Sequence, residues 1–224
     1  MKRRAPVLVP SLNRAVAEAA RCLNGGGLLV FPTETFYALG CRCLDAAAVE
    51  AVYRVKGRDR GQPLPLLAAD RKQAAAFARL EAAPERLYRQ FWPGPLTVLL
   101  PALPVLPELL VNAAGLVAVR VSPHSEASLL ARLAGCPLTA SSANLHGRPP
   151  ASRLQSLDCL LARALEASGA RHGVFEGALP PSGGLPSTLV EPLAATGQGG
   201  KALRLLREGA ISVQALEAAG FRVV

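Results

Sequence analysis

Aromatic residues and lysine are both scarce in this 224-residue sequence. It holds six Phe, three Tyr and one Trp, which is 4% aromatic. So few rings supply a poor stacking platform for single-stranded nucleic acid. Of the 25 basic residues, 21 are Arg and only four are Lys. Because lysine is this rare, a lysine within a motif stands out.

Paired cysteines are also missing. The five cysteines are odd in number, no Cys-x-x-Cys occurs, and the three histidines are scattered. These counts exclude a disulfide framework and argue against a structural zinc site, so they favour a reducing compartment. Cys22, Cys136 and Cys159 have apolar neighbours in the sequence and are expected in the core.

No standard glycine-rich phosphate loop is present. Neither G-x-x-x-x-G-K-[ST] nor G-x-G-x-x-G occurs. The run Gly25–Gly27 leads into an apolar segment and not out of a strand into a helix, so we interpret it as the end of a helix and a turn. A nucleotide bound to this chain would therefore be held by residues other than those of a standard glycine-rich loop.

A leader and a membrane helix are not indicated either. After the basic residues 2–4, the apolar run 5–9 is short and contains Pro6. The longest apolar stretch, 98–119, contains three prolines and Glu108, which favours two strands and a connection over a membrane helix. We therefore expect a soluble, cytoplasmic protein with no membrane contact.

Charge and apolar content point to a folded, basic protein. Half of the residues are hydrophobic, 18% are charged, and the formal net charge is +9. This composition supports a sizeable core and excludes disorder, and the length suits one domain over residues 1–224. The positive charge should attract polyanions such as nucleotides or nucleic acid.

Helical and strand patterns alternate along the chain. Helices are predicted at 11–24, 45–55, from Asp70, at 84–91 and 125–133, from a Ser152 cap to 167, and from a Ser212 cap to 220. Strands are predicted at 6–9, 27–31, 37–41, 64–68, 96–100, 116–121, 137–140, 174–175 and 188–190. The alternation predicts an α/β fold with a mixed sheet flanked by helices. The Gly-, Pro- and Ser-rich region 178–200 is interpreted as long mobile loops around one strand.

Several polar clusters follow predicted strands. Thr33, Glu34 and Thr35 come directly after the strand at 27–31, and the small polar run 141–144 follows another strand. Ligands of open α/β sheets sit at such strand ends, although polar turns look the same in a sequence. No His/Asp arrangement is readable around Ser141 or Ser142, which argues against a nucleophilic triad.

Basic residues stand out at two places. Lys56 and Arg58 end a predicted helix, where they either satisfy carbonyls or form a two-pronged anion site. Arg120 lies inside an apolar strand and therefore needs a partner or faces a site, with His124 at the start of the next helix. Trp92 is interpreted as an aromatic plug over the core.

Taken together, these motifs resemble the YrdC family, the threonylcarbamoyl-AMP synthases. The motifs that carry the resemblance are Pro32–Gly40, Lys56–Arg58, Trp92–Thr97, Arg120–His124, Ser142–Asn144, Ser187–Val190 and Leu206–Gly209. Ala38 stands where the family most often has Gly, Leu67 stands where members often have His or Cys, and the segment after Arg120 differs by one residue. Leu67 offers no hydrogen bond to a bound threonine.

The resemblance implies a twisted mixed sheet with a basic concave face. It implies an enzyme that makes threonylcarbamoyl-adenylate and pyrophosphate from L-threonine, bicarbonate and ATP with Mg²⁺. A separate complex would transfer the product to tRNA, and direct RNA binding is possible. Lys56 and Arg58 would be catalytic. The nucleotide would be held by these two residues and by Arg120, Ser142, Asn144, Arg148 and Arg207. Threonine would be held by Thr33, His124 and Ser187.

Two alternatives stay open at this point. A divergent relative could form a carbamoyl-adenylate without threonine, or the chain could be an RNA-binding module that uses its basic concavity. The intact Lys56–Arg58 and Ser142–Asn144 motifs favour the synthase.

Overall fold

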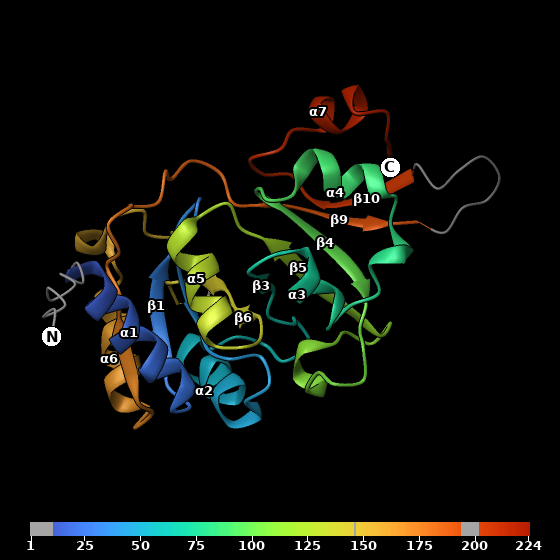
Figure 1. Ribbon diagram of the computed structural model, residues 1–224. Coiled ribbons are helices and arrows are strands. Elements are labelled where there is room, and N and C mark those ends of the chain that lie inside the picture. The colour runs from blue at the N-terminus through green and yellow to red at the C-terminus, as the bar shows by residue number, and fades with distance from the viewer. Residues whose placement is uncertain (1–10, 146, 194–201) are drawn as a thin grey trace, which may run out of the picture.

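Seven α-helices and eleven strands alternate in the described part of the chain, residues 11–145, 147–193 and 202–224 of a computed structural model (Figure 1). The helices are α1 (Ser11–Asn24), α2 (Ala46–Lys56), α3 (Arg71–Ala75), α4 (Glu85–Phe91), α5 (Ser125–Leu133), α6 (Cys159–Ala167) and α7 (Val213–Ala218). The strands are β1 (Leu28–Pro32), β2 (Tyr37–Gly40), β3 (Leu66–Ala68), β4 (Leu96–Pro101), β5 (Leu116–Val121), β6 (Leu138–Thr139), β7 (Ser141–Ser142), β8 (His172–Val174), β9 (Thr188–Pro192), β10 (Ala202–Arg207) and β11 (Arg222–Val223).

The strands form two mixed sheets. The smaller has the order β7-β2-β1-β8, and the larger has the order β11-β10-β9-β4-β5-β3-β6. In the smaller sheet β1 is antiparallel to β2 and parallel to β8, and in the larger β4 is antiparallel to β5 and parallel to β9. The predicted mixed α/β architecture is therefore confirmed.

Alternating side chains of β1 face two different layers of helices. Leu29 and Phe31 join a core cluster with residues of α1 and α5, whereas Leu28 and Val30 join a larger cluster with residues of α2. This division follows from the two-residue period of a strand. Figure 1 shows α1 and α5 running beside β1, and α2 packs against α6.

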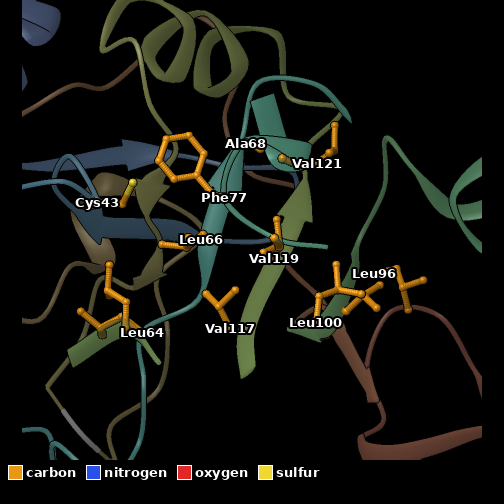
Figure 2. Packing of buried hydrophobic residues seen from close by; sticks show 14 of the residues in the cluster. Cys43, Leu64, Leu66, Ala68, Phe77, Leu96, Leu100, Val117, Val119 and Val121 are labelled. Atoms are coloured by element: carbon orange, nitrogen blue, oxygen red, sulfur yellow. The ribbon is translucent and has the colours of Figure 1, made fainter. Parts of the chain in front are cut away.

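The larger cluster fills the space over the seven-stranded sheet. It takes alternate residues from β3, β4 and β5, among them Leu66, Ala68, Val117, Val119, Val121, Leu96 and Leu100, as Figure 2 shows. Leu67 points the other way and packs with Phe31 in the smaller cluster, where both side chains are fully buried. Trp92 is buried in the larger cluster and its Nε1 donates to the Leu96 carbonyl at 2.7 Å, which confirms the aromatic plug.

One short segment, 138–142, belongs to both sheets. Its first half is β6 of the larger sheet, and its second half is β7 of the smaller sheet. Gly40 allows this close approach, because an added Cβ would lie 1.7 Å from the Thr139 carbonyl oxygen. The two sheets therefore diverge from a shared segment.

Most predicted helix caps are confirmed. Asp45, Asp70 and Ser212 each accept a hydrogen bond from the backbone N–H three residues ahead, at 2.9–3.2 Å. The predicted Ser152 cap is wrong: α6 starts at Cys159, and Asp158 caps it by accepting from the Leu160 N–H. Residues 154–156 form a separate 3₁₀ turn, and the extended backbone of Leu157 (ψ 136°) breaks the helix pattern.

The strand predictions differ from the structure mainly in length and at the edges. Six-residue β5 matches its prediction, and the predicted strand at 174–175 is observed at 172–174. The six-residue β10 and the two-residue β7 and β11 were not among the predicted strands. The predicted strand at 6–9 and the end of the 178–200 region lie outside the described residues. Cys159 is exposed, contrary to expectation, while the other four cysteines are buried and all five are unpaired.

Two further findings concern the helices. The Gly25–Gly27 run forms the predicted helix end, with the Gly26 N–H donating to the Leu23 carbonyl at 3.1 Å and a positive φ of 75° at Gly26. Within the described residues, every helix is too short or too polar to cross a bilayer.

Candidate functional site

A positively charged cleft opens where the two sheets diverge. It has a volume of about 130 Å³ and takes side chains from both sheets. Its lining residues are Thr35, Phe36, Tyr37, Ala38, Arg58, Pro65, Leu66, Thr97, Arg120, Ala140, Ser141, Ser142, Pro186, Ser187 and Arg207. Three of these are arginines and none is acidic, so the cleft suits an anionic ligand.

A larger cavity of about 730 Å³ lies between α1 and β8. None of the site residues predicted from the sequence lines it, and its charged lining residues Glu18, Arg171 and Glu176 are of both signs. Volume alone therefore does not select the candidate site. We take the smaller cleft as the candidate because three arginines line it.

Lys56 lies directly behind the cleft. It is the last residue of α2, and Gly57 turns the chain away in the left-handed region (φ 57°). The Lys56 side chain is buried, and its Nζ donates to the carbonyls of Ser142 and Asn144. Burial, with a smaller effect from Arg58, lowers the pKa of Lys56 to about 7. A neutral amine has two N–H groups for these two carbonyls, and protonation adds a third N–H for a ligand.

The three arginines of the cleft come from separate elements. Arg58 follows α2, with its Nε donating to the Gln62 carbonyl at 2.8 Å, whereas Arg120 lies on β5 and Arg207 ends β10. Burial lowers the pKa of Arg207, and the positive charges of Arg120 and Arg58 add to this effect. Burial also lowers the pKa of Arg58. A buried cation such as Arg207, whose pKa is depressed by neighbouring cations, is stabilised when an anion binds among them.

Arg120 has the partner that its position in an apolar strand requires. Its Nη1 forms an ion pair with Oε1 of Glu34, and Oε2 of Glu34 accepts from the Ser122 hydroxyl. Both members of the ion pair are largely buried, at 8% and 13% side-chain exposure. Glu34 thus fixes Arg120 at the edge of the cleft. The sequence placed Glu34 in a candidate motif but did not identify this pairing.

Ser187 and Arg207 form one wall of the cleft. Nε and Nη2 of Arg207 both donate to the Ser187 carbonyl, at 3.1 and 2.8 Å. The Ser187 hydroxyl lies 2.8 Å from Oγ1 of Thr97. Thr97 was not selected from the sequence as a site residue, because its motif, Trp92–Thr97, was interpreted mainly as an aromatic plug over the core.

The turn after β1 contributes Thr35 to the cleft and keeps Thr33 behind it. The Thr33 hydroxyl donates to the Phe36 carbonyl at 2.7 Å and lies 3.4 Å from the Thr35 hydroxyl. Thr33 is buried and does not line the cleft, whereas Thr35 does. Thr35 is a second residue that the sequence prediction did not select, although it is in the same motif.

His124 caps α5 and is also behind the cleft. Its Nδ1 accepts from the Ala127 N–H at 3.4 Å, and its Nε2 lies 2.9 Å from the Leu179 carbonyl oxygen. The pattern assigns the proton to Nε2, which donates to Leu179. Both ring nitrogens are therefore engaged within the described structure.

The Ser142 side chain lines the cleft, whereas Asn144 does not. Nδ2 of Asn144 donates to the Arg148 carbonyl, and its buried Oδ1 has no hydrogen-bond partner among the residues that the structure describes. Arg148 itself is about half exposed, and its Nε lies 2.7 Å from Oδ2 of Asp158. Arg148 is thus turned toward the start of α6.

The structure therefore brings together five of the predicted site residues and places five around them. Lining the cleft are Arg58, Arg120, Ser142, Ser187 and Arg207. Thr33, Lys56, His124, Asn144 and Arg148 do not line it. Leu67, whose side chain raised a question of specificity, is packed in the core and is also absent from the lining.

Comparison with known proteins finds similarity to one family of proteins. The family model Sua5/YciO/YrdC, described as "Telomere recombination", matches residues 21–209. The chain is 39% identical over 151 residues to the threonylcarbamoyl-AMP synthase of Stenotrophomonas maltophilia, covering 66% of this chain and 81% of that protein. It is 36% identical over 170 residues to the synthase of Thiobacillus denitrificans, covering 75% and 86%.

A solved structure matches the fold closely. The crystal structure of Pyrococcus abyssi Sua5 complexed with L-threonine superposes with a TM-score of 0.77 at 30% identity and covers 93% of this chain. This chain spans 58% of the length of that Sua5 chain. It spans 39% of the length of the curated P. abyssi synthase, to which it is 39% identical over 132 residues.

Proposed function

Because the chain belongs to the Sua5/YciO/YrdC family, we propose that it forms threonylcarbamoyl-adenylate and pyrophosphate from L-threonine, bicarbonate and ATP. The observation that carries this proposal is the meeting of Arg58, Arg120 and Arg207 in one cleft, with the Lys56 amine behind it. Three arginines, together with a lysine amine that gains its charge by taking up a proton, suit a polyphosphate substrate. The names of the relatives support the synthase reaction over the two alternatives raised by the sequence.

The chemistry needs charge stabilisation above all. Threonine's amine and bicarbonate give a carbamate and release water, and a carbamate oxygen then attacks the α-phosphorus of ATP. A new P–O bond forms, the bond from that phosphorus to the bridging oxygen breaks, and pyrophosphate leaves with the electron pair. Negative charge grows on the phosphate oxygens, where a fixed cation or donor contributes about 3–4 kcal/mol, by analogy with oxyanion holes.

Within this proposal, Lys56 and Arg58 stabilise the transition state. The nucleotide is held by these two and by Arg120, Ser142, Asn144, Arg148 and Arg207. The unpartnered Oδ1 of Asn144 can accept a hydrogen bond from a ribose hydroxyl or an adenine amino group. Arg148 would have to leave Asp158 to reach the ligand, because its Nε now lies 2.7 Å from that carboxylate.

The threonine side of the cleft lies between the Thr33–Thr35 turn and Ser187. Thr33, His124 and Ser187 are proposed to hold the amino acid, with Thr35 added because it lines the cleft. His124 and Thr33 act from behind by fixing the surrounding backbone, since their polar atoms are already engaged.

Mg²⁺ is proposed to enter with ATP as part of the substrate. No group of three or more His, Cys, Asp or Glu side chains in the described residues is arranged to hold a metal ion. In nucleotide-dependent enzymes, Mg²⁺ commonly binds through substrate phosphates and water, with few protein ligands. The Glu34 carboxylate contacts the cleft residue Arg120, and Arg120 and Ser122 already occupy its two oxygens.

The product would serve tRNA modification in the cytoplasm. A separate complex would transfer the threonylcarbamoyl group to tRNA, and direct RNA contact by this basic chain belongs to the same proposal. The unpaired cysteines agree with a reducing compartment.

The test is pyrophosphate release by the purified protein with ATP and Mg²⁺, omitting threonine and bicarbonate in turn. The proposal expects release only with all substrates present, and a nucleotide product with the mass of threonylcarbamoyl-adenylate. Release without threonine would favour the carbamoyl-adenylate alternative. RNA binding without any ATP turnover would favour the RNA-binding alternative.

A further inference from the structure

A twelve-residue connection, 176–187, joins the two sheets beside the cleft. It leaves β8 and delivers Ser187 to the cleft immediately before β9. At its start the Glu176 carbonyl accepts a hydrogen bond from the Tyr37 hydroxyl at 2.9 Å. We call residues 176–187 the crossover segment.

The Glu126 carboxylate holds the first part of the crossover segment. Its Oε1 and Oε2 accept from the Ala178 N–H at 2.9 and 3.1 Å, and Oε2 also lies 3.4 Å from the Leu179 nitrogen, which donates to it. Glu126 is in the first turn of α5 and only 5% exposed. Among the described residues, no Lys, Arg or His forms an ion pair with it. Its charge is therefore held by backbone amides at the positive end of a helix.

Gly177 fits the backbone to this carboxylate. Its φ is +73°, and an added Cβ would lie 2.4 Å from Oε2 of Glu126 and 2.8 Å from Cγ of Pro32. The Leu179 carbonyl is held in addition by Nε2 of His124 at 2.9 Å. Glu126 and His124 thus hold two consecutive residues of the crossover segment, Ala178 and Leu179.

Beyond this anchor, the crossover segment contacts the turn that faces the cleft. The Ser182 N–H donates to the Glu34 carbonyl at 3.3 Å, and the Gly183 N–H donates to the Thr35 carbonyl at 2.8 Å. Glu34 holds Arg120, and Thr35 lines the cleft. One short segment therefore runs from the Glu126 anchor, across this turn, to Ser187.

We propose that Glu126 is a positioning residue for the amino-acid side of the cleft: it anchors the crossover segment and so sets the positions of Thr35 and Ser187. The kinetic part of this inference, the effect on the threonine KM, rests on the proposed function. If Glu126 only stabilised α5, its removal would lower the melting temperature and leave the ratio of the threonine KM to the ATP KM unchanged. A positioning residue affects threonine more than ATP, because most nucleotide ligands proposed above lie on other elements.

The experiment compares Glu126→Ala, Glu126→Gln and the control Glu166→Ala, in which an exposed glutamate of α6 is removed. Steady-state kinetics gives kcat and both KM values. Amide hydrogen exchange follows residues 178, 179, 182 and 183 in the absence of substrates. Gly177→Ala disturbs the same contact from the side of the crossover segment.

For Glu126→Ala we expect the threonine KM to rise about tenfold, with the ATP KM changed less than about twofold, as for loss of a charged hydrogen bond that acts on one substrate. Exchange should accelerate at all four amides, and Gly177→Ala should behave in the same way. Glu126→Gln retains one acceptor oxygen and should restore the threonine KM to within about threefold of the wild type. The control should match the wild type.

Unchanged exchange at the four amides in Glu126→Ala would overturn the anchor. Faster exchange with an unchanged ratio of the two KM values would overturn the positioning role. If the wild-type protein releases no pyrophosphate, the proposed function fails and the kinetic role fails with it, whereas the exchange data still decide whether Glu126 anchors the segment. Should Glu126→Ala not fold, Glu126→Gln and Gly177→Ala supply the same comparisons.

Discussion

Glu34 and Arg120, 86 positions apart in the sequence, form a largely buried ion pair that connects the turn after β1 to β5. One partner belongs to the smaller sheet's turn and the other to the larger sheet. The pair therefore joins the two sides of the cleft. It also keeps a guanidinium in a position where an unpaired charge would be costly.

Removing one member of this pair should destabilise the protein. Glu34→Gln leaves Arg120 buried and unpaired, so the free energy of unfolding should fall by about 3–5 kcal/mol. The double variant Glu34→Gln/Arg120→Gln should lose less than the sum of the two single variants. Urea denaturation measures all three.

The exposed pair of Arg89 and Glu85 provides the matched comparison. Arg89→Gln should change the free energy of unfolding by at most about 0.5 kcal/mol, because surface pairs contribute little. Additive effects at Glu34 and Arg120 would show that the pair is not energetically coupled.

Lys56 and Arg58 should be separable from the other basic residues by their effect on turnover. Lys56→Ala and Arg58→Ala should each lower the rate of pyrophosphate release by about 10²–10³, as for loss of a preorganised donor. Circular dichroism should show that both variants remain folded. Lys72→Ala and Arg163→Ala, at exposed positions, serve as the controls. Near-wild-type rates in both Lys56 and Arg58 variants would contradict the catalytic assignment.

The lowered pKa of Lys56 predicts a proton-linked affinity for ATP. In the free protein the amine has a pKa of about 7 and is mostly neutral at pH 8. Bound phosphate favours the ammonium form, so its pKa rises on binding and up to about one proton is taken up. The affinity for ATP should therefore fall as pH rises above 7.

Calorimetric titration in two buffers of different ionisation enthalpy measures this uptake. The wild type and Lys72→Ala should show a buffer-dependent heat at pH 8, whereas Lys56→Met should lose most of that dependence. The same heat in both buffers for the wild type would argue that Lys56 does not change protonation when ATP binds.

The Thr33–Thr35 turn should affect threonine more than ATP. Thr35→Val removes a hydroxyl from the cleft lining and should raise the threonine KM by about tenfold. Thr33→Val should raise it less, because the Thr33 hydroxyl acts through the Phe36 carbonyl and the neighbouring Thr35 hydroxyl. Ser156→Ala, at an exposed position outside the cleft lining, is the control. An effect confined to the ATP KM would contradict this placement of the amino acid.

Much of the fold followed from local patterns in the sequence. The boundaries of β5 and α5 were predicted to the residue, because an apolar run and a capped amphipathic pattern are local signals. The start of α6 was wrong because Ser152 and Asp158 are both good caps, and only the backbone at Leu157 decides between them. The pairing order of the strands depends on long-range contacts that no local pattern contains.

The candidate site, like the fold, was predicted only in part. The sequence selected residue types suited to phosphate, and five of those side chains share one cleft. It did not separate a side chain that faces the cleft from a neighbour that supports it, as Thr35 and Thr33 illustrate. That distinction depends on the direction in which each side chain leaves a turn, which the sequence pattern leaves open. The roles of the individual residues remain predictions that the variants above will test.

The segment 138–142, shared by both sheets, has a consequence for how the family can change its substrates. Arg120 and Arg207 come from the larger sheet, whereas Thr35 and Ser142 belong to the smaller sheet or its turn. The five residues of this segment connect the two sheets directly, with Gly40 closely packed against Thr139. A relative that accepts a bulkier amino acid would therefore be expected to differ in this segment, by an inserted residue or an altered bend, before it differs in its arginines.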